Sequence, residues 1–289
     1  MSQQTHSRLN DVLNEIHRDI SGDLSVKHLA KIAAFSEQHF HRAFQHYVGE
    51  SVHHYVCRVR LEQAANQLMF DQGSRIIDIA FKCGFRSLSS FSRAFKVQLG
   101  MAPGEWRKHH SIERAPNFME DASIHAGYEN IKDKPLPEPQ LVETQEIRVA
   151  YLRHRGYNKS IRHCWQKLML WAAEEGIKNP VQIALHHSNP TWVPLEDCLY
   201  VACIEIDKPL LRRSYVNSMI IPSGLHARFN LRGVYGELIP YISKIMTQWV
   251  PASGFKTKTT PSWVKYHKNQ FLSEDQSFEL DLYLPISLY

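Results

Sequence analysis

Two sets of polar side chains in the first 110 residues have the types that contact nucleic acid. Arginine forms paired hydrogen bonds with guanine or phosphate, glutamine pairs with adenine, and serine accepts several partners. Each set has the spacing of one helix face; the members are Glu37, Gln38, His41, Arg42 and Gln45 in the first set and Arg86, Ser89, Ser92, Arg93 and Lys96 in the second. Either face can read base edges or hold phosphates, although any surface helix also has a polar face.

The elements that carry these faces are repeated. The segment Phe40–Phe44 (FHRAF) returns as Phe91–Phe95 (FSRAF), and a glycine follows each copy at the same spacing, Gly49 and Gly100. A single polar face is common on surface helices. Its repetition at the same positions of a second unit is not, so the repeat favours a shared function.

Apolar spacing predicts a helix-turn-helix in each copy, over about residues 24–50 and 75–101. The predicted turn residues are Ala34 and Gly84, and the predicted N-caps of the second helices are Ser36 and Ser87. A long helix over about 52–70 joins the two copies. This layout favours a protein that reads two consecutive segments of the DNA major groove, which faces the same side about every 34 Å.

The charge balance agrees with a polyanionic partner. Residues 1–110 hold 14 Lys+Arg and 10 Asp+Glu, a balance of 14 − 10 = +4, whereas residues 111–289 hold 20 and 19, a balance of +1. A basic first part is expected of a nucleic-acid binder but is common elsewhere too.

Composition excludes several classes. Hydrophobic residues make up 43% and charged residues 22% of the 289 residues, as in globular proteins. The apolar runs are too short to span a membrane, and the start MSQQTHSRLNDV has no apolar signal core, so we expect a cytoplasmic protein without a membrane partner. The five cysteines form no CxxC pair, and we expect buried structural thiols.

The second half has a different organisation. Proline and glycine signals over residues 111–139 predict an irregular, stiff linker. From residue 140 to 289, the order strand-helix-strand-strand occurs twice, which predicts an α+β domain with a mostly antiparallel sheet. The expected strands lie near 147–152, 199–206, 225–231 and 278–285, and the expected helices near 161–173 and 238–249.

The first half resembles AraC/XylS-type DNA-binding domains over about residues 8–108. The stretch RIIDIAFKCGFRSLSSFSRAFKVQLGMAPGEWRK carries the pattern IAxxxGFxSxxxFxRxFKxxxGxxPxxxR. The resemblance implies an all-α, homeodomain-like double helix-turn-helix domain over residues 1–110 that binds double-stranded DNA. It also implies a transcription regulator, commonly an activator that contacts RNA polymerase.

By position, this resemblance implies which side chains meet DNA. The implied base readers are Gln38, His41 and Arg42 in the first unit and Arg86, Ser89, Ser92 and Arg93 in the second. The implied phosphate contacts are Arg58, Arg60, Lys96 and Arg107. Leu88 is apolar at a position expected to be exposed; it meets a thymine methyl group or packs at the domain surface.

The second half resembles GyrI-like effector-binding domains over about residues 140–287, through VAYLRHRGYN, IPSGLHARFNLRGVYGEL, WVPASGF and LDLYLPI. The resemblance implies pseudo-two-fold βαββ repeats with a cleft for a bulky, hydrophobic or cationic small molecule. The order of the two domains resembles that of Rob-like regulators. The candidate ligand-binding residues are Tyr157, Trp171, Glu205, Trp263 and Tyr266.

One departure from this second family bears on the ligand. Val264 stands where an acidic residue is expected two positions before Tyr266, and the strand Leu199–Ile204 also lacks its acid. A buried cation without a carboxylate is poorly compensated, so we expect a neutral or anionic ligand. Glu205 and Asp281 remain as sources of charge, and a ligand-free domain that serves only protein contacts is the other outcome.

No enzyme motif is present, because the sequence lacks GxSxG, P-loop, HExxH and GxGxxG patterns. We expect no cofactor and no metal, since the adjacent His186 and His187 would face opposite sides of a strand. The leading prediction is a sequence-specific transcription regulator that senses a small molecule. The alternatives are an architectural DNA binder without a ligand and a hydrolase in the rear domain, against which Val264 argues.

Overall fold

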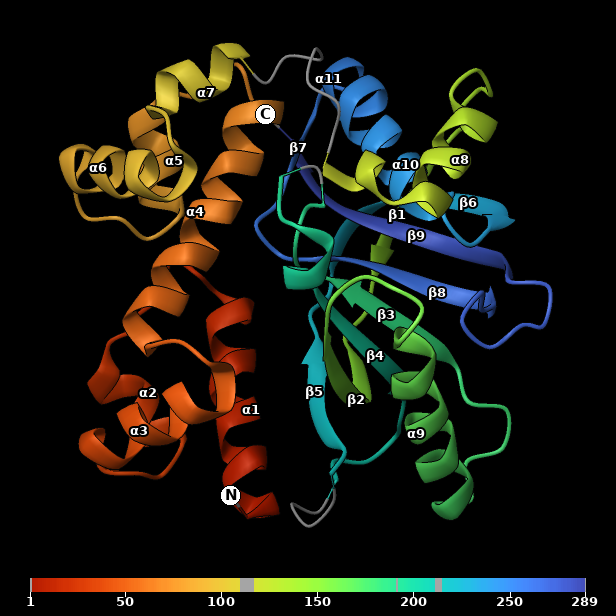
Figure 1. The fold of residues 1–289 in the computed structure, drawn as a ribbon, viewed down its shortest axis with the longest axis horizontal. Helices are drawn as coiled ribbons and strands as arrows, with labels where there is room; N and C mark the ends of the chain where they lie inside the picture. The colour runs from red at the N-terminus through yellow and green to blue at the C-terminus, as the bar shows by residue number, and fades with distance from the viewer. Residues whose placement is uncertain (1, 110–116, 191, 211–214, 289) are drawn as a thin grey trace. The chain divides into compact units, whose positions relative to one another are not determined.

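The computed structural model describes residues 2–109, 117–190, 192–210 and 215–288. The described residues form two compact units, one from residues 2–109 and Tyr215 and one from residues 117–190, 192–210 and 216–288 (Figure 1). The described elements of the first unit are all helices, and the second unit contains an antiparallel sheet with helices. This confirms the predicted two-domain layout.

The first unit consists of two similar helix pairs joined by a long helix. Its helices are α1 (Gln3–Arg18), α2 (Val26–Ile32), α3 (Glu37–Val48), α4 (Val52–Phe70), α5 (Ile76–Lys82), α6 (Leu88–Leu99) and α7 (Pro103–His109). In Figure 1, α4 runs from the α2–α3 pair to the α5–α6 pair.

The turn inside each pair has the same hydrogen bonds. The backbone N–H of Phe35 donates to the carbonyl of Ala30, and that of Phe85 donates to Ala80, each at 3.0 Å. In both turns the residue before the phenylalanine has a left-handed backbone, with φ 51° at Ala34 and 81° at Gly84. This is the Schellman ending of a helix, which glycine adopts without strain and alanine does not.

Each pair is closed by three aromatic rings. The triads are Phe40, Phe44 and Tyr55 in the first pair and Phe91, Phe95 and Trp106 in the second. Successive ring centroids lie 5.4–5.7 Å apart in both triads. Tyr55 of α4 and Trp106 of α7 hold equivalent places, so the sequence repeat extends into the helix that follows each pair. Because one side of α3 and of α6 is buried against this ring triad, the other side is left for solvent or a partner.

The second unit is built on a nine-stranded antiparallel sheet with the strand order β1-β6-β9-β8-β3-β4-β2-β5, in which β7 pairs with β9 off this path. Its strands are β1 (Gln140–Thr144), β2 (Ile147–Arg155), β3 (Gln182–His186), β4 (Leu199–Glu205), β5 (Asn217–Ile221), β6 (Gly224–Val234), β7 (Phe255–Thr257), β8 (Ser262–Lys268) and β9 (Ser277–Leu288). Its helical segments are η1 (Asn117–Glu120), α8 (Ala122–Ile131), α9 (Ile161–Glu174), η2 (Leu195–Asp197), α10 (Leu238–Lys244), the π-helical η3 (Ile245–Trp249) and α11 (Val250–Ala252).

Alternate residues of each strand belong to opposite faces of this sheet. Trp165 of α9 lies with its ring centroid 5.8 Å from that of Tyr266 on β8, so Tyr266 belongs to the face that α9 covers. We call this the helix-covered face. Trp263, three residues earlier on β8, belongs to the opposite face, where its ring stacks on Tyr283 of β9 at 3.8 Å.

The predicted linker is wrong in its middle part, because residues 117–131 are helical. Asp121 caps α8 and accepts hydrogen bonds from the backbone N–H groups of Ser123 at 2.9 Å and Ile124 at 3.0 Å. Ile124 and Ile131 are buried. The part of the predicted linker at 111–116 lies outside the described residues.

The apparent helix breaker in this segment, Gly127, has a packing role. A Cβ atom on Gly127 would lie 2.4 Å from the carbonyl oxygen of Gly236. The end of α8 is also held, because the ammonium group of Lys244 donates to the carbonyls of Ile131 at 3.1 Å and Lys132 at 2.8 Å. The glycine therefore marks a close approach of α8 to the turn after β6, and sequence alone does not separate that role from a loop.

Replacing Gly127 by alanine should lower the free energy of unfolding by about 1–3 kcal/mol, because a backbone atom cannot yield to the new methyl group. Urea unfolding would measure the loss. The control is Gly104→Ala in α7, where the nearest atom to the new Cβ is a side-chain carbon 3.7 Å away. That variant should be neutral or slightly stabilising, since alanine favours a helix by up to about 1 kcal/mol. Equal effects of the two changes would contradict the packing role.

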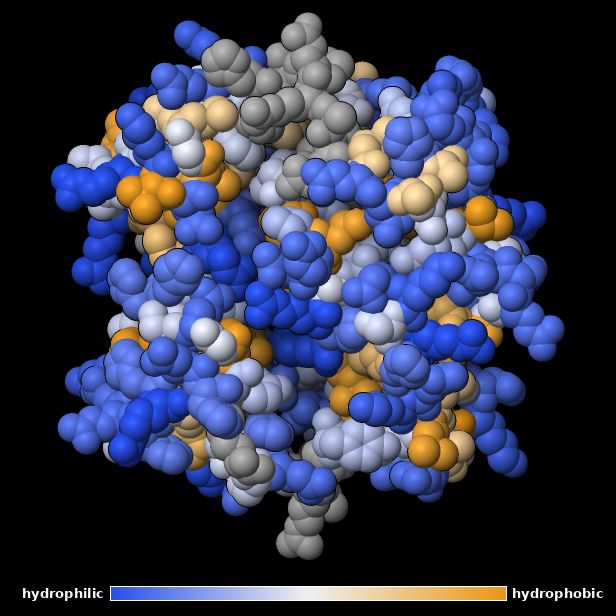
Figure 2. All heavy atoms as spheres, viewed as in Figure 1, coloured by the Kyte–Doolittle hydropathy of each residue, from blue (hydrophilic) through white to orange (hydrophobic). Residues whose placement is uncertain are grey.

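Within the described part of the chain, no helix has the length and apolar character needed to cross a membrane. On the face drawn in Figure 2, hydrophilic residues cover most of the surface and apolar ones occur in small separate groups. The five cysteines are free thiols; four are buried, as expected, and Cys57 is half-buried.

Candidate nucleic-acid interface and candidate ligand site

The outer side of α3 presents four of the predicted polar residues. Gln38, His41, Arg42 and Gln45 are all exposed. The helix begins at its predicted cap, Ser36, whose hydroxyl accepts a hydrogen bond from the backbone N–H of the third helical residue at 3.3 Å. The side chains at the start of α3 are therefore held in a regular helix and face away from the core.

The outer side of α6 is arranged in the same way. Ser89, Arg93 and Lys96 are exposed, as is Arg86 just before the helix, while Ser92 is half-buried. Leu88 is 40% exposed at the first position of α6. The structure therefore leaves Leu88 outside the core, which disfavours its packing role and keeps the contact with a thymine methyl group as the alternative.

The arginines and the lysine of these outer sides have no bonded partner in the described part of the chain. Arg42, Arg86, Arg93 and Lys96 form no ion pair and no side-chain hydrogen bond with any residue that the structure describes. Unpaired exposed cations in register on two equivalent helices are what a polyanion contact requires.

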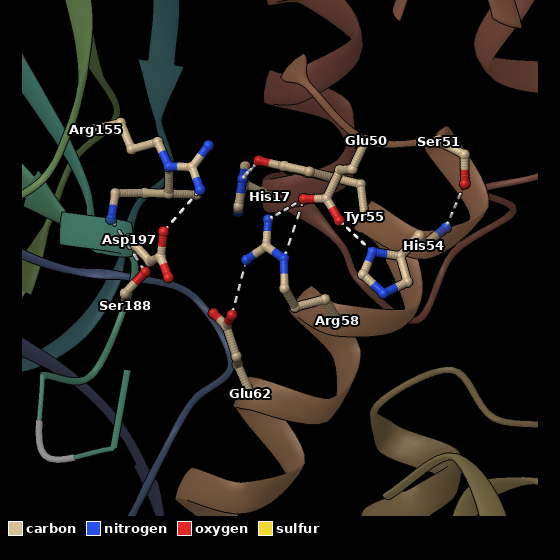
Figure 3. A network of polar contacts seen from close by, with 11 residues as sticks. His17, Glu50, Ser51, His54, Tyr55, Arg58, Glu62, Arg155, Ser188 and Asp197 are labelled. Atoms are coloured by element: carbon tan, nitrogen blue, oxygen red, sulfur yellow. Dashed lines mark hydrogen bonds and ion pairs between the residues drawn. The ribbon is translucent and has the colours of Figure 1, made fainter. Parts of the chain in front are cut away.

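Arg58, a predicted phosphate contact, is bound by the protein itself. Figure 3 shows its guanidinium between Glu50 and Glu62, with nitrogen–oxygen distances of 2.6 and 2.8 Å. His54 contacts the second oxygen of Glu50. Burial raises the pKa of the Glu50 carboxyl, but the hydrogen bonds and positive charges of Arg58 and His54 together outweigh it and leave that pKa below its usual value. The geometry assigns Arg58 to the packing of α4 and disfavours the phosphate contact.

Arg60 and Arg107 are also engaged inside the first unit. The Arg60 guanidinium donates to the carbonyls of Ile20 at 2.8 Å and Gly22 at 3.1 Å, and so ties α4 to the loop after α1. Arg107 donates to the carbonyl of Ser74 at 2.8 Å. Of the four predicted phosphate contacts, Lys96 is the one whose charged group forms no ion pair and no hydrogen bond with any described residue. The carbonyl acceptors of Arg60 and Arg107 lie 33 to 40 residues away in sequence, so the spacing of residues in the sequence does not reveal them.

The helix-covered face of the second unit carries a group of seven rings that we call the aromatic cluster. Neighbouring ring centroids lie 5.4–6.2 Å apart, mostly edge to face. The cluster consists of Tyr157, Trp165, His186, Tyr200, Tyr235, Tyr266 and Phe271. Such a group of amphipathic rings is typical of a small-molecule site.

Polar groups connect the rings. The indole N–H of Trp165 donates to the hydroxyl of Tyr200 at 3.0 Å, and that hydroxyl lies 3.3 Å from the hydroxyl of Tyr266. Gln270 lies beside the hydroxyls of Tyr157 and Tyr266 and lowers the pKa of both, against the larger effect of burial. Burial raises the pKa of all three tyrosines, so their hydroxyls are protonated donors at neutral pH.

The structure brings together two of the five predicted ligand residues, Tyr157 and Tyr266. Trp171 is a buried residue of α9, with no ring contact to the aromatic cluster among the described residues. Trp263 and Glu205 lie on the opposite face of the sheet, since Glu205 pairs with Val149 of that face. These two do not line a site on the helix-covered face, and their role in ligand binding stays a prediction.

Asp281, the other proposed source of charge, also lies on the opposite face. It pairs with Lys265 in the sheet and contacts the imidazole of His267 at 3.0 Å. Val264 is completely buried on the helix-covered face, between Ala184 and Leu282.

Sequence reasoning missed several members of the cluster, although a signal existed for some. Tyr200 and Tyr266 lie on strands in which alternate residues face opposite sides of the sheet. Once the pairing register of these strands is known, both tyrosines belong to the same face. Phe271 and Gln270 follow β8 in a loop and had no pattern to mark them. His186 was considered only as a metal ligand.

His186 gives the cluster a pH dependence. Burial lowers the pKa of this histidine from its usual 6.5 to about 4. The unfolded chain then takes up a proton below pH 6.5 that the folded chain accepts only near pH 4, so stability is lost as pH falls through this window. Replacing His186 by glutamine should reduce the loss between pH 6.5 and 4 by about 1–3 kcal/mol, measured by urea unfolding at several pH values. Between pH 7 and 8 the difference between the two proteins should be constant, and a difference that still changes there would contradict the assignment.

Comparison with known families agrees with the two-domain organisation of the chain. Residues 137–287, more than half of the chain, match the family described as GyrI-like small molecule binding domain. The chain belongs to the GyrI-like family. Residues 29–109 match a second family, described as a helix-turn-helix domain. The matches confirm both resemblances, and we refer to residues 137–287 as the GyrI-like unit.

Curated relatives align with the helix-turn-helix half. An uncharacterized HTH-type transcriptional regulator, YbfP of Bacillus subtilis (strain 168), is 36% identical over 111 residues, which is 37% of this chain and 37% of the relative. The HTH-type transcriptional activator AarP of Providencia stuartii is 31% identical over 106 residues, 37% of this chain and 78% of AarP. The chain thus spans about a third of the length of the first of these relatives.

A solved structure aligns with the other half. The crystal structure of the EcmrR C-terminal domain is 14% identical, with a TM-score of 0.42, and the alignment covers 54% of this chain and all of that domain.

Proposed function

We propose that this chain is a sequence-specific, DNA-binding transcription regulator whose GyrI-like unit binds a small-molecule effector. The observation that carries the proposal is the doubled helix-turn-helix with free cations on equivalent outer positions. Arg42 of α3 and Arg93 of α6 are 51 residues apart in the repeat, and both are exposed and unpaired within the described residues. Relatives that match this half are named transcriptional regulators.

The length of α4 supports the reading of two successive groove segments. Its 19 residues extend over about 28 Å at 1.5 Å per residue. That length approaches the roughly 34 Å between successive major-groove openings on one side of DNA. In the proposed complex, the base readers are Gln38, His41, Arg42, Arg86, Ser89, Ser92 and Arg93, and Lys96 contacts phosphate.

The strand order supports the two-fold arrangement proposed for the GyrI-like unit. The strands β2-β4-β3 on one side of the sheet correspond to β6-β9-β8 on the other, and β3 pairs with β8 at the centre. A helix follows β2 and another follows β6, which gives βαββ twice. Both halves contribute to the aromatic cluster, Tyr157 and Tyr200 from the first and Tyr235 and Tyr266 from the second. We therefore place the effector at this cluster.

The name of AarP as an activator supports activation, with contact to RNA polymerase, as the direction of regulation. Cytoplasmic residence belongs to the same proposal, since the promoter is the proposed target.

Selection of binding sites from a random duplex pool, with the full-length chain at fixed near-physiological salt, tests the proposal. Salt must be fixed because phosphate contacts make affinity depend steeply on it. The expected result is one motif with two short boxes about one helical turn apart. A pool without an enriched motif would instead indicate an architectural DNA binder.

A further inference from the structure

Among the buried polar atoms of the GyrI-like unit that have no hydrogen-bond partner in the described residues, two lie at the aromatic cluster. They are Oε1 of Gln270, whose side chain is almost fully buried, and Nε2 of His186. Buried polar groups are nearly always paired, so each unpaired one calls for a missing partner. Gln270 directly precedes Phe271 of the cluster and lowers the pKa of Tyr157, and the His186 ring lies 5.9 Å from the ring of Tyr157.

The unpaired atom of the Gln270 amide is its carbonyl oxygen. The side chain also lowers the pKa of Tyr157 and Tyr266, so it lies beside both hydroxyls. The free atom is therefore one that accepts a hydrogen bond and cannot donate.

The surroundings of these atoms carry no charge. No carboxylate or cation among the described residues contributes to the shifted pKa of Tyr157, Tyr200, Tyr266 or His186; burial comes first for each. The sheet between Tyr200 and Tyr266 is covered by small apolar side chains, those of Ala184, Ala202 and Val264.

Two described charges of opposite sign lie at the edge of the cluster, both near Tyr235. The Lys159 ammonium is over the ring of Tyr235, 5.4 Å from its centroid, and the carboxylate of Asp121 adds to burial in raising the pKa of that tyrosine. Because the two charges offset each other, this edge supplies no net counter-charge for an ionic ligand, and Lys159 already occupies the face of the Tyr235 ring that a cation would use.

We propose that the GyrI-like unit binds an uncharged aromatic molecule that carries an N–H or O–H donor, with the donor on Oε1 of Gln270 and the ring among Tyr157, Tyr200 and Tyr266. The proposal rests on the effector-binding role proposed above. A cation would lose its hydration without gaining a counter-charge, and an anion would do the same. An uncharged ring gains the aromatic contacts, and its donor satisfies the free carbonyl oxygen.

The test uses the full-length protein and four two-ring probes of similar size, measured by isothermal titration calorimetry at pH 7. The probes are 4-phenylphenol (uncharged donor), biphenyl (uncharged, no donor), N-methyl-4-phenylpyridinium (cation) and biphenyl-4-carboxylate (anion). The expected result is that 4-phenylphenol binds at least ten-fold more tightly than either ion and several-fold more tightly than biphenyl.

Two variants of Gln270 sharpen this test. Gln270→Glu has the same shape and adds a carboxylate, so it should bind N-methyl-4-phenylpyridinium at least ten-fold more tightly than the unchanged protein does. Gln270→Leu should remove the preference for 4-phenylphenol over biphenyl. The matched control is Gln140→Glu on β1, whose side chain contacts Arg228 on the opposite face; it should leave all four affinities unchanged.

The outcomes separate this proposal from the role it rests on. Tighter binding of the cation or the anion than of 4-phenylphenol overturns the uncharged ligand but keeps an effector site. Binding of none of the probes overturns the proposal together with the effector-binding role. An unchanged probe order in Gln270→Glu and Gln270→Leu shows that the ligand does not contact Gln270, which also overturns the proposal.

Discussion

Replacing Arg42 and Arg93 together by alanine should weaken binding to the selected DNA site by about 2–6 kcal/mol, twice the 1–3 kcal/mol of one base-reading arginine. The two residues occupy equivalent positions on α3 and α6. Neither has an ion pair in the described part of the chain that would compete with a base. Because the residues lie in different helix-turn-helix units, their losses should add.

Fluorescence anisotropy at fixed salt, on the selected site and on a scrambled duplex, would measure the change. The control is Arg18→Ala, which also removes one exposed positive charge from the first unit; its side chain on α1 is 67% exposed and pairs with Glu15. That variant should lower the affinity for both duplexes slightly and by the same factor. If the double variant also lost the same affinity for both, Arg42 and Arg93 would be phosphate contacts and the base-reading assignment would be wrong.

Local signals explain what was predictable in the first unit. The caps Ser36 and Ser87, the turn residues Ala34 and Gly84 and the apolar spacing act within one helix pair, so sequence gives them directly. Arg58 has one partner that is local in sequence, Glu62 four residues later on α4. Arg60 instead binds the carbonyls of Ile20 and Gly22, which are far away in sequence. Exposure and charge look alike for such arginines in a sequence, so only the fold distinguishes the bound Arg60 from the free Arg93.

The ligand site was harder to predict because it depends on the register of a sheet. Trp263 and Tyr266 are three residues apart on one strand and therefore face opposite sides. The sequence shows both as aromatic, and only the contact of Trp165 with Tyr266 decides which side the helix covers. Gln270, the residue that now carries the ligand inference, lies in a loop without any repeating pattern.

The repeated turn also gives the largest expected change in stability. Gly84→Ala should lower the free energy of unfolding by about 2–5 kcal/mol, from the strain of a left-handed alanine and from a steric clash. At φ 81°, the new Cβ would lie 2.6 Å from the carbonyl oxygen of Ile20 and 2.7 Å from the guanidinium of Arg60. Since Arg60 donates to that same carbonyl, the methyl group would break the tie between α4 and the loop after α1.

The equivalent turn supplies the matched control. Ala34 already has a left-handed backbone, with φ 51°, and its side chain is exposed, so Ala34→Gly removes strain without removing a contact. It should raise the free energy of unfolding by up to about 1 kcal/mol. This net gain is the backbone strain that is relieved, reduced by the cost of ordering a glycine, which is more flexible in the unfolded chain. Urea unfolding of both variants, and of Gly84→Ala combined with Arg60→Ala, separates the two causes. If the clash with Arg60 matters, the double variant loses less than the sum of the single losses. Simple additivity would instead assign the loss to backbone strain and to the clash with the Ile20 carbonyl, both of which are independent of the Arg60 side chain.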